Sequence, residues 1–271
     1  MPFYDTILIT LIVEGWGQVK KFLENAEILQ NEAIIPDVWK MVFHAPKIAA
    51  EAKPGQFVNM QKQGGQTFLR RPFGIVDADA ETGAVTIIYR LVGTGTQEMA
   101  AMKVGEVISA EGPLGEGVFT TAPGKALLVG GGVGLAPLIF LAKKLDKPVV
   151  LVAGKTAAET FWTKFFEPYA EKIYVTTDDG SLGIKGFAVH ALPTIFAENP
   201  IDRVSVCGPT VMMQTIAEAS DAAGVACEVS MEKRMACGIG VCLGCTFESK
   251  LSGKRYKVCA DGPVFPAKEV F

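Results

Sequence analysis

The pattern of apolar and polar positions changes twice along the chain and divides it into three parts. Between about residues 25 and 120, strand-sized segments are separated by turn signals such as Pro-Gly at 54–55 and Glu-Thr-Gly at 81–83. Every second residue of Trp39–Phe43 is large and apolar, which places these side chains on one face of a strand. Short strands at this spacing, without long helical periodicity, predict a small antiparallel β-barrel.

The rhythm changes after Pro-Gly at 123–124. The segment 125–145 reads as an apolar strand, a glycine turn and a helix. Three more apolar strands follow, VVLVAG, KIYVTT and RVSVCG, each separated from the next by helical or loop sequence. This alternation predicts a parallel, doubly wound α/β sheet from roughly 124 to 225.

The length of 271 residues accommodates two compact domains and a small appendage. We therefore expect a β plus α/β protein in four segments. They are an N-terminal extension at 1–22, the barrel at 23–122, the α/β domain at 123–226 and a cysteine module at 227–271.

The N-terminal extension contains an apolar run, Ile7–Val13, that is too short to span a bilayer. It also lacks the basic region and cleavage site of a signal peptide. We expect a cytoplasmic protein, because a reducing compartment suits free thiolates. The barrel pattern begins at Lys20, so our hypothesis is that residues 1–18 come from a start codon assigned too far upstream.

The charge balance argues against nucleic-acid binding. Lys and Arg total 26 and Asp and Glu total 29, so the formal net charge is −3 and no basic surplus is available for phosphates. Charged residues make up 20% of the chain, below the ~25% of typical soluble domains. Two interpretations stay open, a surface hidden against another subunit and a well-buried α/β core.

Cysteine spacing is the most specific signal. Near the C-terminus, C-x4-C-x2-C-x13-C is formed by Cys237, Cys242, Cys245 and Cys259. The first three match the plant-type ferredoxin spacing, which with a distant fourth thiolate holds a 2Fe–2S cluster. Gly238, Gly240 and Gly244 add little bulk and let backbone N–H groups turn toward the sulfur atoms. A zinc site more often pairs two C-x2-C knuckles, and a disulfide framework does not suit a chain of this size without a secretion signal. Zinc and no metal remain the alternatives.

Two glycine-containing turns in the α/β domain are candidates for a nucleotide site. Gly130–Gly134 follows the first strand and opens a helix, where backbone N–H groups favour a pyrophosphate. Cys207-Gly208-Pro209 ends a later strand, at the edge where open α/β sheets bind ligands. The alternatives are a plain strand–helix turn and a buried, inert cysteine; for Cys227 we prefer the inert interpretation.

Within the barrel, LRRPFG at 69–74 places an Arg fork, suited to phosphate, beside an aromatic ring. A surface salt bridge next to a core Phe is the alternative. The strand Thr86–Arg90 leads into Gly93–Thr96, a second candidate phosphate loop. A barrel with an Arg motif, a glycine-turn sheet and ferredoxin-type cysteines therefore occur in this order in one chain.

That order resembles the ferredoxin–NADP reductase superfamily, with its flavin-binding barrel, pyridine-nucleotide domain and, in some members, ferredoxin module. More closely, residues 23–271 resemble the electron transfer subunits of class 1B dihydroorotate dehydrogenases. The similar segments are NAEILQNEAIIPDVWKMVFHAP, LRRPFGI, IIYRLVGTGT, LLVGGGVGLAPL, TTDDGSLGIKG, CGPTVMM, MEKRMACGIGVCLGC and ADGPVF.

The resemblance implies three sets of ligands. FAD is expected at Arg71, Pro72, Phe73, Gly74, Ile88, Tyr89, Arg90, Gly95 and Thr96. NAD is expected at Gly130, Gly131, Gly132, Gly134, Cys207, Gly208 and Pro209, with Cys207 near the nicotinamide. The cluster is expected on the four cysteines of the C-terminal spacing. Gly74 replaces the usual serine of the flavin motif, so a hydroxyl contact to the flavin ring is lost.

The resemblance also implies a role in pyrimidine biosynthesis. The chain is expected to relay electrons from the FMN of a catalytic partner subunit, through the cluster and FAD, to NAD+. Dihydroorotate oxidation belongs to the partner, in a heterotetramer of two copies of each subunit. FAD is needed between cluster and NAD+ because a cluster passes electrons singly and NAD+ accepts a pair.

Two other functions remain as alternatives. The first is an NAD(P)H–ferredoxin or NAD(P)H–sulfur oxidoreductase subunit with the same modules, and the second is a zinc-stabilised interaction protein without catalysis. Only the resemblance favours NAD over NADP. The segment VAGKTAAET gives NAD no support, because it has no acidic residue for a ribose hydroxyl until Glu159, and Lys155 is able to neutralise the 2′-phosphate of NADP.

Overall fold

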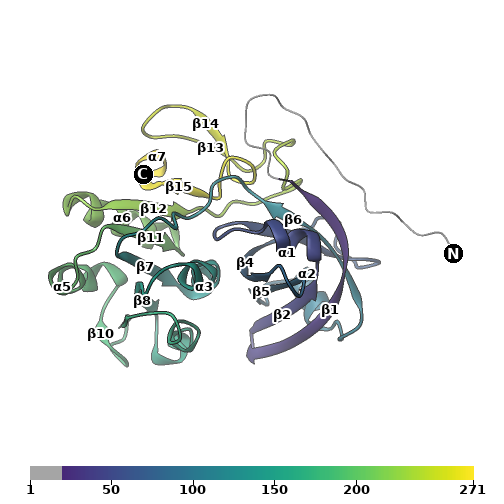
Figure 1. The fold of residues 1–271 in the computed structure, drawn as a ribbon, viewed down its shortest axis with the longest axis horizontal. Helices are drawn as coiled ribbons and strands as arrows, with labels where there is room; N and C mark the ends of the chain where they lie inside the picture. Colours follow the sequence, from purple (N-terminus) through teal and green to yellow (C-terminus); the bar gives the residue numbers. More distant parts are fainter. Residues whose placement is uncertain (1–19) are drawn as a thin grey trace.

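The computed structural model describes residues 20–271, and the hypothesis about residues 1–18 lies outside this range. Figure 1 shows a β-barrel on one side of the molecule and a helix-covered sheet on the other. The C-terminal segment, with its small hairpin, lies above the junction of the two. Both predicted architectures are therefore confirmed, a barrel followed by an α/β sheet.

The barrel consists of six antiparallel strands with two short helices, and its bounds are β1 Phe22–Ile35, β2 Val38–His44, α1 Pro46–Glu51, β3 Phe57–Lys62, β4 Arg71–Asp79, β5 Ala84–Arg90, α2 Thr94–Ala100 and β6 Val107–Leu114. The strand order is β1-β2-β5-β4-β3-β6, and β6 pairs with β1 to close the barrel. The alternation expected in the second strand is present, because Met41 and Phe43 are fully buried inside.

The second part is a seven-stranded sheet with helices, whose bounds are β7 Ala126–Gly131, α3 Leu135–Lys144, β8 Val149–Gly154, α4 Thr163–Phe166, β9 Lys172–Thr177, β10 Ile184–Lys185, α5 Leu192–Glu198, β11 Arg203–Cys207, α6 Thr210–Ala222, β12 Ala226–Ser230 and β15 Val264–Pro266. Its order is β10-β9-β8-β7-β11-β12-β15, and every pair is parallel except β12 with β15. The order reverses between β7 and β11, the switch point at which such sheets bind ligands.

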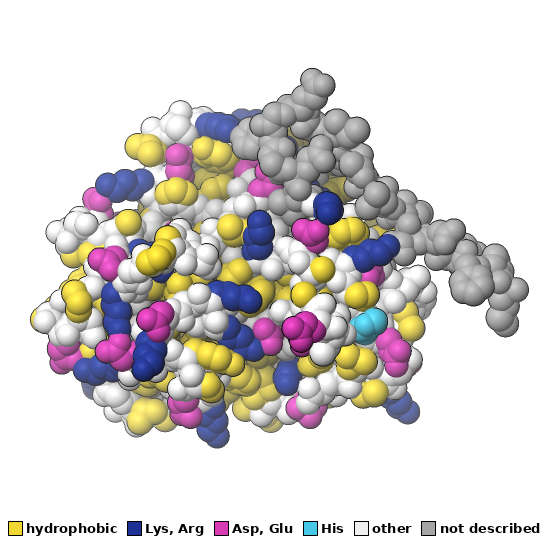
Figure 2. All heavy atoms as spheres, in the orientation of Figure 1, with side chains coloured by type: hydrophobic (Ala, Val, Ile, Leu, Met, Phe, Trp, Pro, Cys, Tyr) yellow, Lys and Arg dark blue, Asp and Glu magenta, His cyan; other side chains and the backbone are white. Residues whose placement is uncertain are grey.

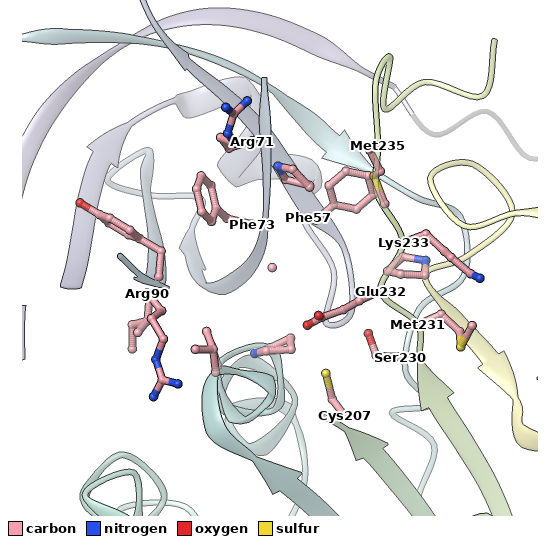
Figure 3. Close-up of a pocket in the computed structure, with 18 of the residues that line it drawn as sticks. Phe57, Arg71, Phe73, Arg90, Cys207, Ser230, Met231, Glu232, Lys233 and Met235 are labelled. Atoms are coloured by element: carbon pink, nitrogen blue, oxygen red, sulfur yellow. The ribbon is translucent and has the colours of Figure 1, made fainter. Parts of the chain in front are cut away.

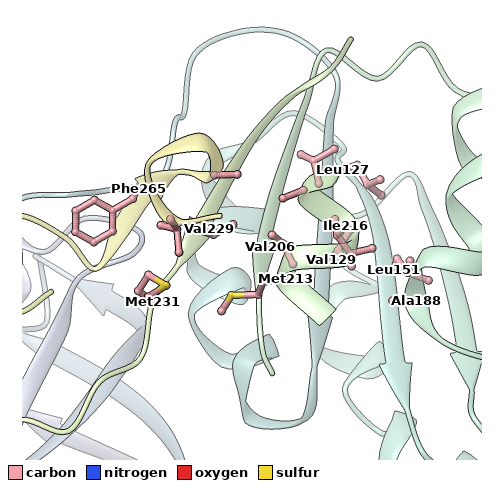
Figure 4. Close-up of a cluster of buried hydrophobic side chains, with 14 of the residues drawn as sticks. Leu127, Val129, Leu151, Ala188, Val206, Met213, Ile216, Val229, Met231 and Phe265 are labelled. Carbon is pink, nitrogen blue, oxygen red and sulfur yellow. The ribbon is translucent and has the colours of Figure 1, made fainter. Parts of the chain in front are cut away.

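The central strands are apolar throughout because both faces of the sheet are covered. Leu127 and Val129 of β7 pack on one face, where Figure 4 shows them near Met213 and Ile216 of α6. Leu128 of the same strand faces the opposite core, together with α3. Helix α3 lies between sheet and barrel, since its Phe140 joins the barrel core. This shared helix fixes the two parts against each other.

The C-terminal segment is joined to the sheet at both ends. It leaves the sheet after β12, carries the hairpin β13 (Thr246–Glu248) and β14 (Arg255–Lys257), returns as β15 and ends in α7 (Ala267–Val270). The Gly117 N–H donates to the Gly262 carbonyl at 3.0 Å, which also ties the segment to the chain that leaves the barrel. The expected limit between residues 226 and 227 falls inside strand β12. The four domain limits stay predictions.

Charged side chains of both signs are mixed on the visible face of the molecule (Figure 2). On the face shown in Figure 2, Lys and Arg alternate with Asp and Glu over both parts and form no large patch of one sign. Among residues 20–271, no helix has both the length and the apolar character needed to cross a bilayer.

Candidate functional site

A cavity of about 620 Å³ opens where the barrel, helix α3 and the segment after β12 meet (Figure 3). Its lining comes from all three parts of the chain: Gly55, Phe57, Arg71, Pro72, Phe73, Gly74, Ile88, Tyr89, Arg90, Val92, Thr96, Val133, Ala136, Pro137, Cys207, Ser230, Met231, Glu232, Lys233, Arg234, Met235 and Pro263. The cavity lies at the carboxyl end of β11, beside the switch point of the sheet. This position and size suit a flat aromatic cofactor together with part of a nucleotide.

The barrel wall of the cavity is built by the start of β4 and the end of β5. The rings of Phe73 and Tyr89 lie 5.5 Å apart at 53°. The Tyr89 hydroxyl donates to Asn31 Oδ1 at 3.1 Å, and burial raises the pKa of Tyr89. The Tyr89 hydroxyl therefore stays protonated and is held by Asn31. The wall formed by Phe73 and Tyr89 is rigid and largely apolar, which suits the packing of a flavin ring against it.

The predicted FAD segments converge at one end of this wall. An added Cβ at Gly95 would lie 2.9 Å from Arg71 Nε, so the start of α2 lies directly against the Arg71 guanidinium. Thr96 Oγ1 accepts the Val92 N–H at 3.0 Å and shapes the loop before α2. Arg90 Nε pairs with Asp37 Oδ2 at 3.1 Å. Segments far apart in sequence thus place two guanidinium groups at one cavity.

Gly74 is explained by the position of α3. An added Cβ at Gly74 would lie 3.2 Å from Pro137 Cβ, which is tighter than an ordinary contact. Helix α3 therefore approaches β4 closely at the point where the superfamily motif carries serine. A serine here would require Pro137 to move by a few tenths of an ångström.

The two predicted nucleotide turns touch each other, but most of their residues lie behind the cavity lining. An added Cβ at Gly134 would lie 2.6 Å from the Cys207 carbonyl oxygen, so only glycine permits this approach. Cys207 lines the cavity, whereas the following set does not: Gly130, Gly131, Gly132, Gly134, Gly208 and Pro209. Burial, and secondarily the Glu232 charge, raise the pKa of Cys207 to about 12, which keeps the thiol protonated.

The four predicted cluster cysteines come together as two pairs. The Cys242 N–H points at Cys237 Sγ (3.4 Å), and the Cys259 N–H points at Cys245 Sγ (3.4 Å). The Gly240 N–H donates to Cys259 Sγ at 3.1 Å and links the two pairs. Backbone N–H groups directed at sulfur, as predicted from the glycines, stabilise thiolates.

The arrangement in pairs fits a two-iron cluster, in which each iron takes two protein thiolates. Within the described part of the chain, no group of three or more His, Cys, Asp or Glu side chains is arranged to hold a single metal ion. Burial alone would raise the pKa of Cys237, but the backbone N–H groups of Cys242, Ile239 and Val241 lower it to about 7. Burial and the Cys245 thiol raise the pKa of Cys259 to about 12.

The two pairs differ in exposure. Cys245 and Cys259 are 3% and 1% exposed, whereas Cys242 is exposed at the surface. Val241 and Leu243 on either side of Cys242 are 68% and 58% exposed. One edge of the cluster site therefore faces outward within an apolar rim.

Contacts with the barrel hold the first cysteine loop in place. Asn59 of β3 donates from Nδ2 to the Cys237 carbonyl at 3.4 Å. Gly238 has a φ of +73°, and an added Cβ would lie 2.5 Å from Asn59 Nδ2, so a side chain at 238 is excluded. Arg70, the first arginine of the LRRPFG motif, donates to the Asn59 carbonyl and to Ser109 rather than toward the cavity.

Residues 231–235 belong to the resembling segment MEKRMACGIGVCLGC, but no site role was expected for them or for Ser230, although Ser230–Met235 forms one side of the cavity. The segment starts at the last residue of β12 and leads to Cys237, and this position is the signal that could have indicated a role. Met235 lines the cavity and Cys237 follows two residues later. The cavity and the cluster loop are therefore contiguous along the chain.

Comparison with known families gives two matches. Residues 25–119 match the oxidoreductase FAD-binding domain, and residues 232–271 match the iron–sulfur cluster binding domain of dihydroorotate dehydrogenase B. The chain thus contains an FAD-binding domain and an iron–sulfur domain, in agreement with the expected cofactors.

Two curated relatives cover nearly the whole chain. The dihydroorotate dehydrogenase B (NAD(+)) electron transfer subunit of Caldanaerobacter subterraneus is 40% identical over 248 residues, 91% of this chain and 97% of the relative. The protein of the same name from Fusobacterium nucleatum is 38% identical over 258 residues, 92% and 98% of the two chains.

Solved structures share the fold. A chain from the structure of the NADH-dependent reduced ferredoxin–NADP oxidoreductase, described in connection with flavin-based electron bifurcation, superposes with a TM-score of 0.82 at 32% identity, covering 92% of this chain and 90% of that one. A ferredoxin NADP+ reductase from Neisseria gonorrhoeae, with bound FAD and NADP, has a TM-score of 0.60 at 16% identity, covers 79% and 95%, and supports the fold alone.

Proposed function

We propose an electron path for this chain, which belongs to the family of dihydroorotate dehydrogenase B (NAD(+)) electron transfer subunits. Electrons enter from a catalytic partner subunit that oxidises dihydroorotate on its own FMN. They pass through the 2Fe–2S site to the FAD site and leave on NAD+, as a step of pyrimidine biosynthesis. The observation that carries the proposal is the contiguity of cavity and cluster loop between Met235 and Cys237.

The order of the groups follows from electron counting. NAD+ accepts a pair of electrons, an iron–sulfur cluster passes them one at a time, and bound FAD supplies the exchange between the two modes. The chain's own residues provide the positions. The cluster loop lies beside the cavity, and the carboxyl end of β11 opens into the same cavity.

The residue assignments are part of the proposal. Arg71 and the segments around Gly74, Tyr89 and Thr96 hold FAD, because they form a rigid apolar wall that ends at a guanidinium group. The glycine turn and the Cys207 turn hold NAD, with Cys207 at the nicotinamide. The four cysteines of the C-terminal spacing hold the cluster.

The partner is proposed to dock on the exposed edge of the cluster site. Val241 and Leu243 present apolar side chains on both sides of Cys242, and electron transfer requires close approach at this edge. The name of the relatives, electron transfer subunit, implies a catalytic partner. Two copies of each subunit in a cytoplasmic heterotetramer is the finer proposal.

A second candidate is an NAD(P)H–ferredoxin or NAD(P)H–sulfur oxidoreductase subunit. The observation in its favour is the TM-score of 0.82 with a chain of an NADH-dependent ferredoxin–NADP oxidoreductase. The two candidate functions differ in the partner that docks on the exposed edge of the cluster site.

The test compares the isolated chain with the complex. The isolated chain is expected to be brown-yellow and to reduce dyes with NADH. Reduction of NAD+ by dihydroorotate is expected only after a dihydroorotate dehydrogenase catalytic subunit is added. Dihydroorotate oxidation by the isolated chain contradicts the division of labour. Reduction of ferredoxin or sulfur, with no response to the catalytic subunit, supports the second candidate.

A further inference from the structure

A polar side chain is buried where the barrel meets the cysteine module. Asn59 of β3 is 1% exposed, and its Oδ1 atom is buried without a hydrogen-bond partner among residues 20–271. Burial of an amide costs free energy unless its polar atoms are bonded, and an apolar side chain at this position would avoid that cost. The contacts of the amide nitrogen must therefore explain why an asparagine stands here.

The amide nitrogen faces the start of the first cysteine loop. Asn59 Nδ2 donates to the Cys237 carbonyl at 3.4 Å, and an added Cβ at Gly238 would lie 2.5 Å from the same nitrogen. The peptide between Cys237 and Gly238 thus lies directly against Asn59, with its carbonyl directed at the barrel. Asn59 therefore fixes the backbone that immediately follows the first cluster thiol.

The loop beyond this peptide surrounds the sulfur of Cys237. Backbone N–H groups of Ile239, Val241 and Cys242 form hydrogen bonds to this sulfur. Gly238 and Gly240 both have positive φ, +73° and +86°, so the loop turns sharply within a few residues. The direction of the N–H groups depends on where such a loop begins, and the contact with Asn59 sets that point.

Asn59 is itself held by two charged residues of the barrel. Arg70 Nη1 donates to the Asn59 carbonyl at 3.3 Å and to the Ser109 carbonyl at 3.2 Å. Glu111 stands opposite Asn59 across the β3–β6 pair, and its Oε2 lies 3.9 Å from Arg70 Nε. Burial raises the pKa of Glu111, while the Arg70 charge and the Asn59 side chain oppose this effect. Asn59 Nδ2 is thus placed between two acceptors, which fixes the orientation of the amide.

The same elements also reach the cavity. Figure 3 shows Arg71 and Phe57 among its lining residues. Phe57 precedes Asn59 by two residues on β3 and shares a buried cluster with Cys245 and Cys259. The two adjacent arginines of LRRPFG therefore have separate tasks. Arg71 borders the proposed flavin site, and Arg70 supports the strand on which the cluster loop rests.

We propose that Asn59, held by Arg70 and Glu111, is a positioning residue that raises the reduction potential of the cluster. The inference rests on the proposed 2Fe–2S site. Uptake of an electron adds a negative charge there, so N–H groups directed at sulfur favour the reduced state. By fixing the start of the loop, Asn59 keeps these N–H groups on the Cys237 sulfur and so favours the acceptance of electrons.

The test is an anaerobic redox titration of the FAD- and cluster-containing protein with the substitution Asn59→Ala. Paramagnetic resonance follows the cluster, and absorbance follows the flavin. The equilibrium constant for cluster reduction is expected to fall about tenfold, the lower end of the effect of losing a supporting residue at a metal site. For one electron this corresponds to a potential lower by about 59 mV. The flavin potential is expected to stay at the wild-type value.

Two further variants separate the hydrogen bond from packing and from charge. Asn59→Val refills most of the space without a donor, so it is expected to lower the potential like Asn59→Ala. Arg70→Lys keeps the charge but loses the guanidinium fork, and a smaller shift in the same direction is expected. A wild-type potential in Asn59→Val overturns the proposal. A wild-type potential in Arg70→Lys overturns the support that it assigns to Arg70.

Asn199→Ala is the matched control. Its Nδ2 also donates to a backbone carbonyl, that of Ile195 at 2.9 Å, but it lies at the end of α5, outside both sites. The cluster potential of this variant is expected to equal that of the wild type. A shift as large as that of Asn59→Ala would show a general effect of losing a buried amide and would reject the specific role of Asn59.

Hydrogen exchange gives a readout that does not depend on the potential. The backbone N–H groups of residues 239–242 are expected to exchange about tenfold faster in Asn59→Ala, as for one lost hydrogen bond, while the β13–β14 hairpin is unchanged. If this variant takes up no cluster while FAD stays bound, exchange in Arg70→Lys decides, and wild-type rates there reject the proposal. Absence of a 2Fe–2S signal in the wild type refutes the proposed function instead, and the exchange rates still decide whether Asn59 positions the loop.

Discussion

The cavity and the cysteine module meet at the segment after β12, but they are built in opposite ways. The cysteine module takes its thiols from one short stretch, and local N–H groups such as that of Gly240 orient the sulfur atoms. The cavity collects its lining from the barrel, helix α3, β11 and the C-terminal segment. Loss of one thiol is therefore expected to abolish binding at the cysteine module. Loss of one side chain in the cavity is expected only to weaken binding, because many other contacts remain.

The largest effect is expected from the buried thiol pair. Cys259→Ala removes one of the two thiols that we propose for one iron, at a site that is 1% exposed, so no water or surface group replaces it easily. We expect loss of nearly all iron and acid-labile sulfide, while FAD remains bound. Metal analysis together with the absorption spectrum measures both. Cys227→Ala is the control, because Cys227 lies outside the four-cysteine spacing; equal iron in both variants contradicts the assignment.

A smaller but selective effect is expected at the exposed edge of the module. Leu243→Asp places a charge in the apolar rim beside Cys242, where the side chain is 58% exposed. If this residue is a hot spot, the loss of about 2 kcal/mol weakens partner binding roughly 30-fold. Titration of the catalytic subunit against dihydroorotate-dependent NAD+ reduction measures the effect.

NADH–dye reductase activity of Leu243→Asp is expected to stay at the wild-type level, because the cavity is untouched. Val104→Asp on the barrel, where the side chain is 65% exposed, is the matched control and should leave the titration unchanged. A wild-type titration curve for Leu243→Asp would contradict the proposal that the partner docks at the cluster edge.

In the cavity, a single contact should cost less than a thiol. Arg71→Ala removes the guanidinium that lies against Gly95, and a lost hydrogen bond to a charged group costs about 1.5–3 kcal/mol. We expect the Kd for FAD to rise about 10- to 100-fold, with the cluster retained. Equilibrium dialysis of the flavin measures it. Arg255→Ala on exposed β14 serves as the control, and equal FAD affinity in the two variants would exclude Arg71 from the flavin site.

The same contrast explains what could be predicted from the sequence. The set of four cysteines was expected from their spacing, because the short glycine-containing loop that carries the first three leaves the chain few arrangements; their arrangement in pairs was not predicted. The barrel and the sheet follow from periodicity, as Met41 and Phe43 or Leu127 and Val129 illustrate. Each of these features is encoded within a short stretch of chain.

The cavity wall after β12 could not be predicted in the same way. Glu232 becomes a cavity residue only because β12 joins β11 and the barrel packs against α3, which are contacts between distant segments. Arg70 is the opposite case, a residue of a predicted site motif that does not line the cavity. It stands beside Arg71 in the motif, but its guanidinium turns to Ser109 and the Asn59 carbonyl, and sequence alone does not distinguish the two arginines.

A modest effect is expected at Gly74, where helix α3 sets the limit. Gly74→Ala adds the Cβ that meets Pro137 at 3.2 Å, and such overpacking costs about 1–3 kcal/mol. Gly74→Ser adds the same Cβ and also the superfamily hydroxyl. Thermal melts of both variants should therefore show the same loss of stability, and any further change in the flavin spectrum in Gly74→Ser reports the hydroxyl. Unchanged stability in both would mean that α3 moves freely at this contact.

The smallest effect is expected in the pH dependence of stability. Because the folded protein raises the pKa of Glu232, the folded state binds the proton more tightly than the unfolded state. Stability from this group is fully present below the unfolded pKa and is lost as the pH rises through the folded pKa. Glu232→Gln removes this loss. The Tm of the variant minus the Tm of the wild type should therefore increase as the pH rises from acid to neutral and above. A difference that does not vary with pH, as expected for Glu248→Gln, would show that the cavity does not perturb the Glu232 carboxyl.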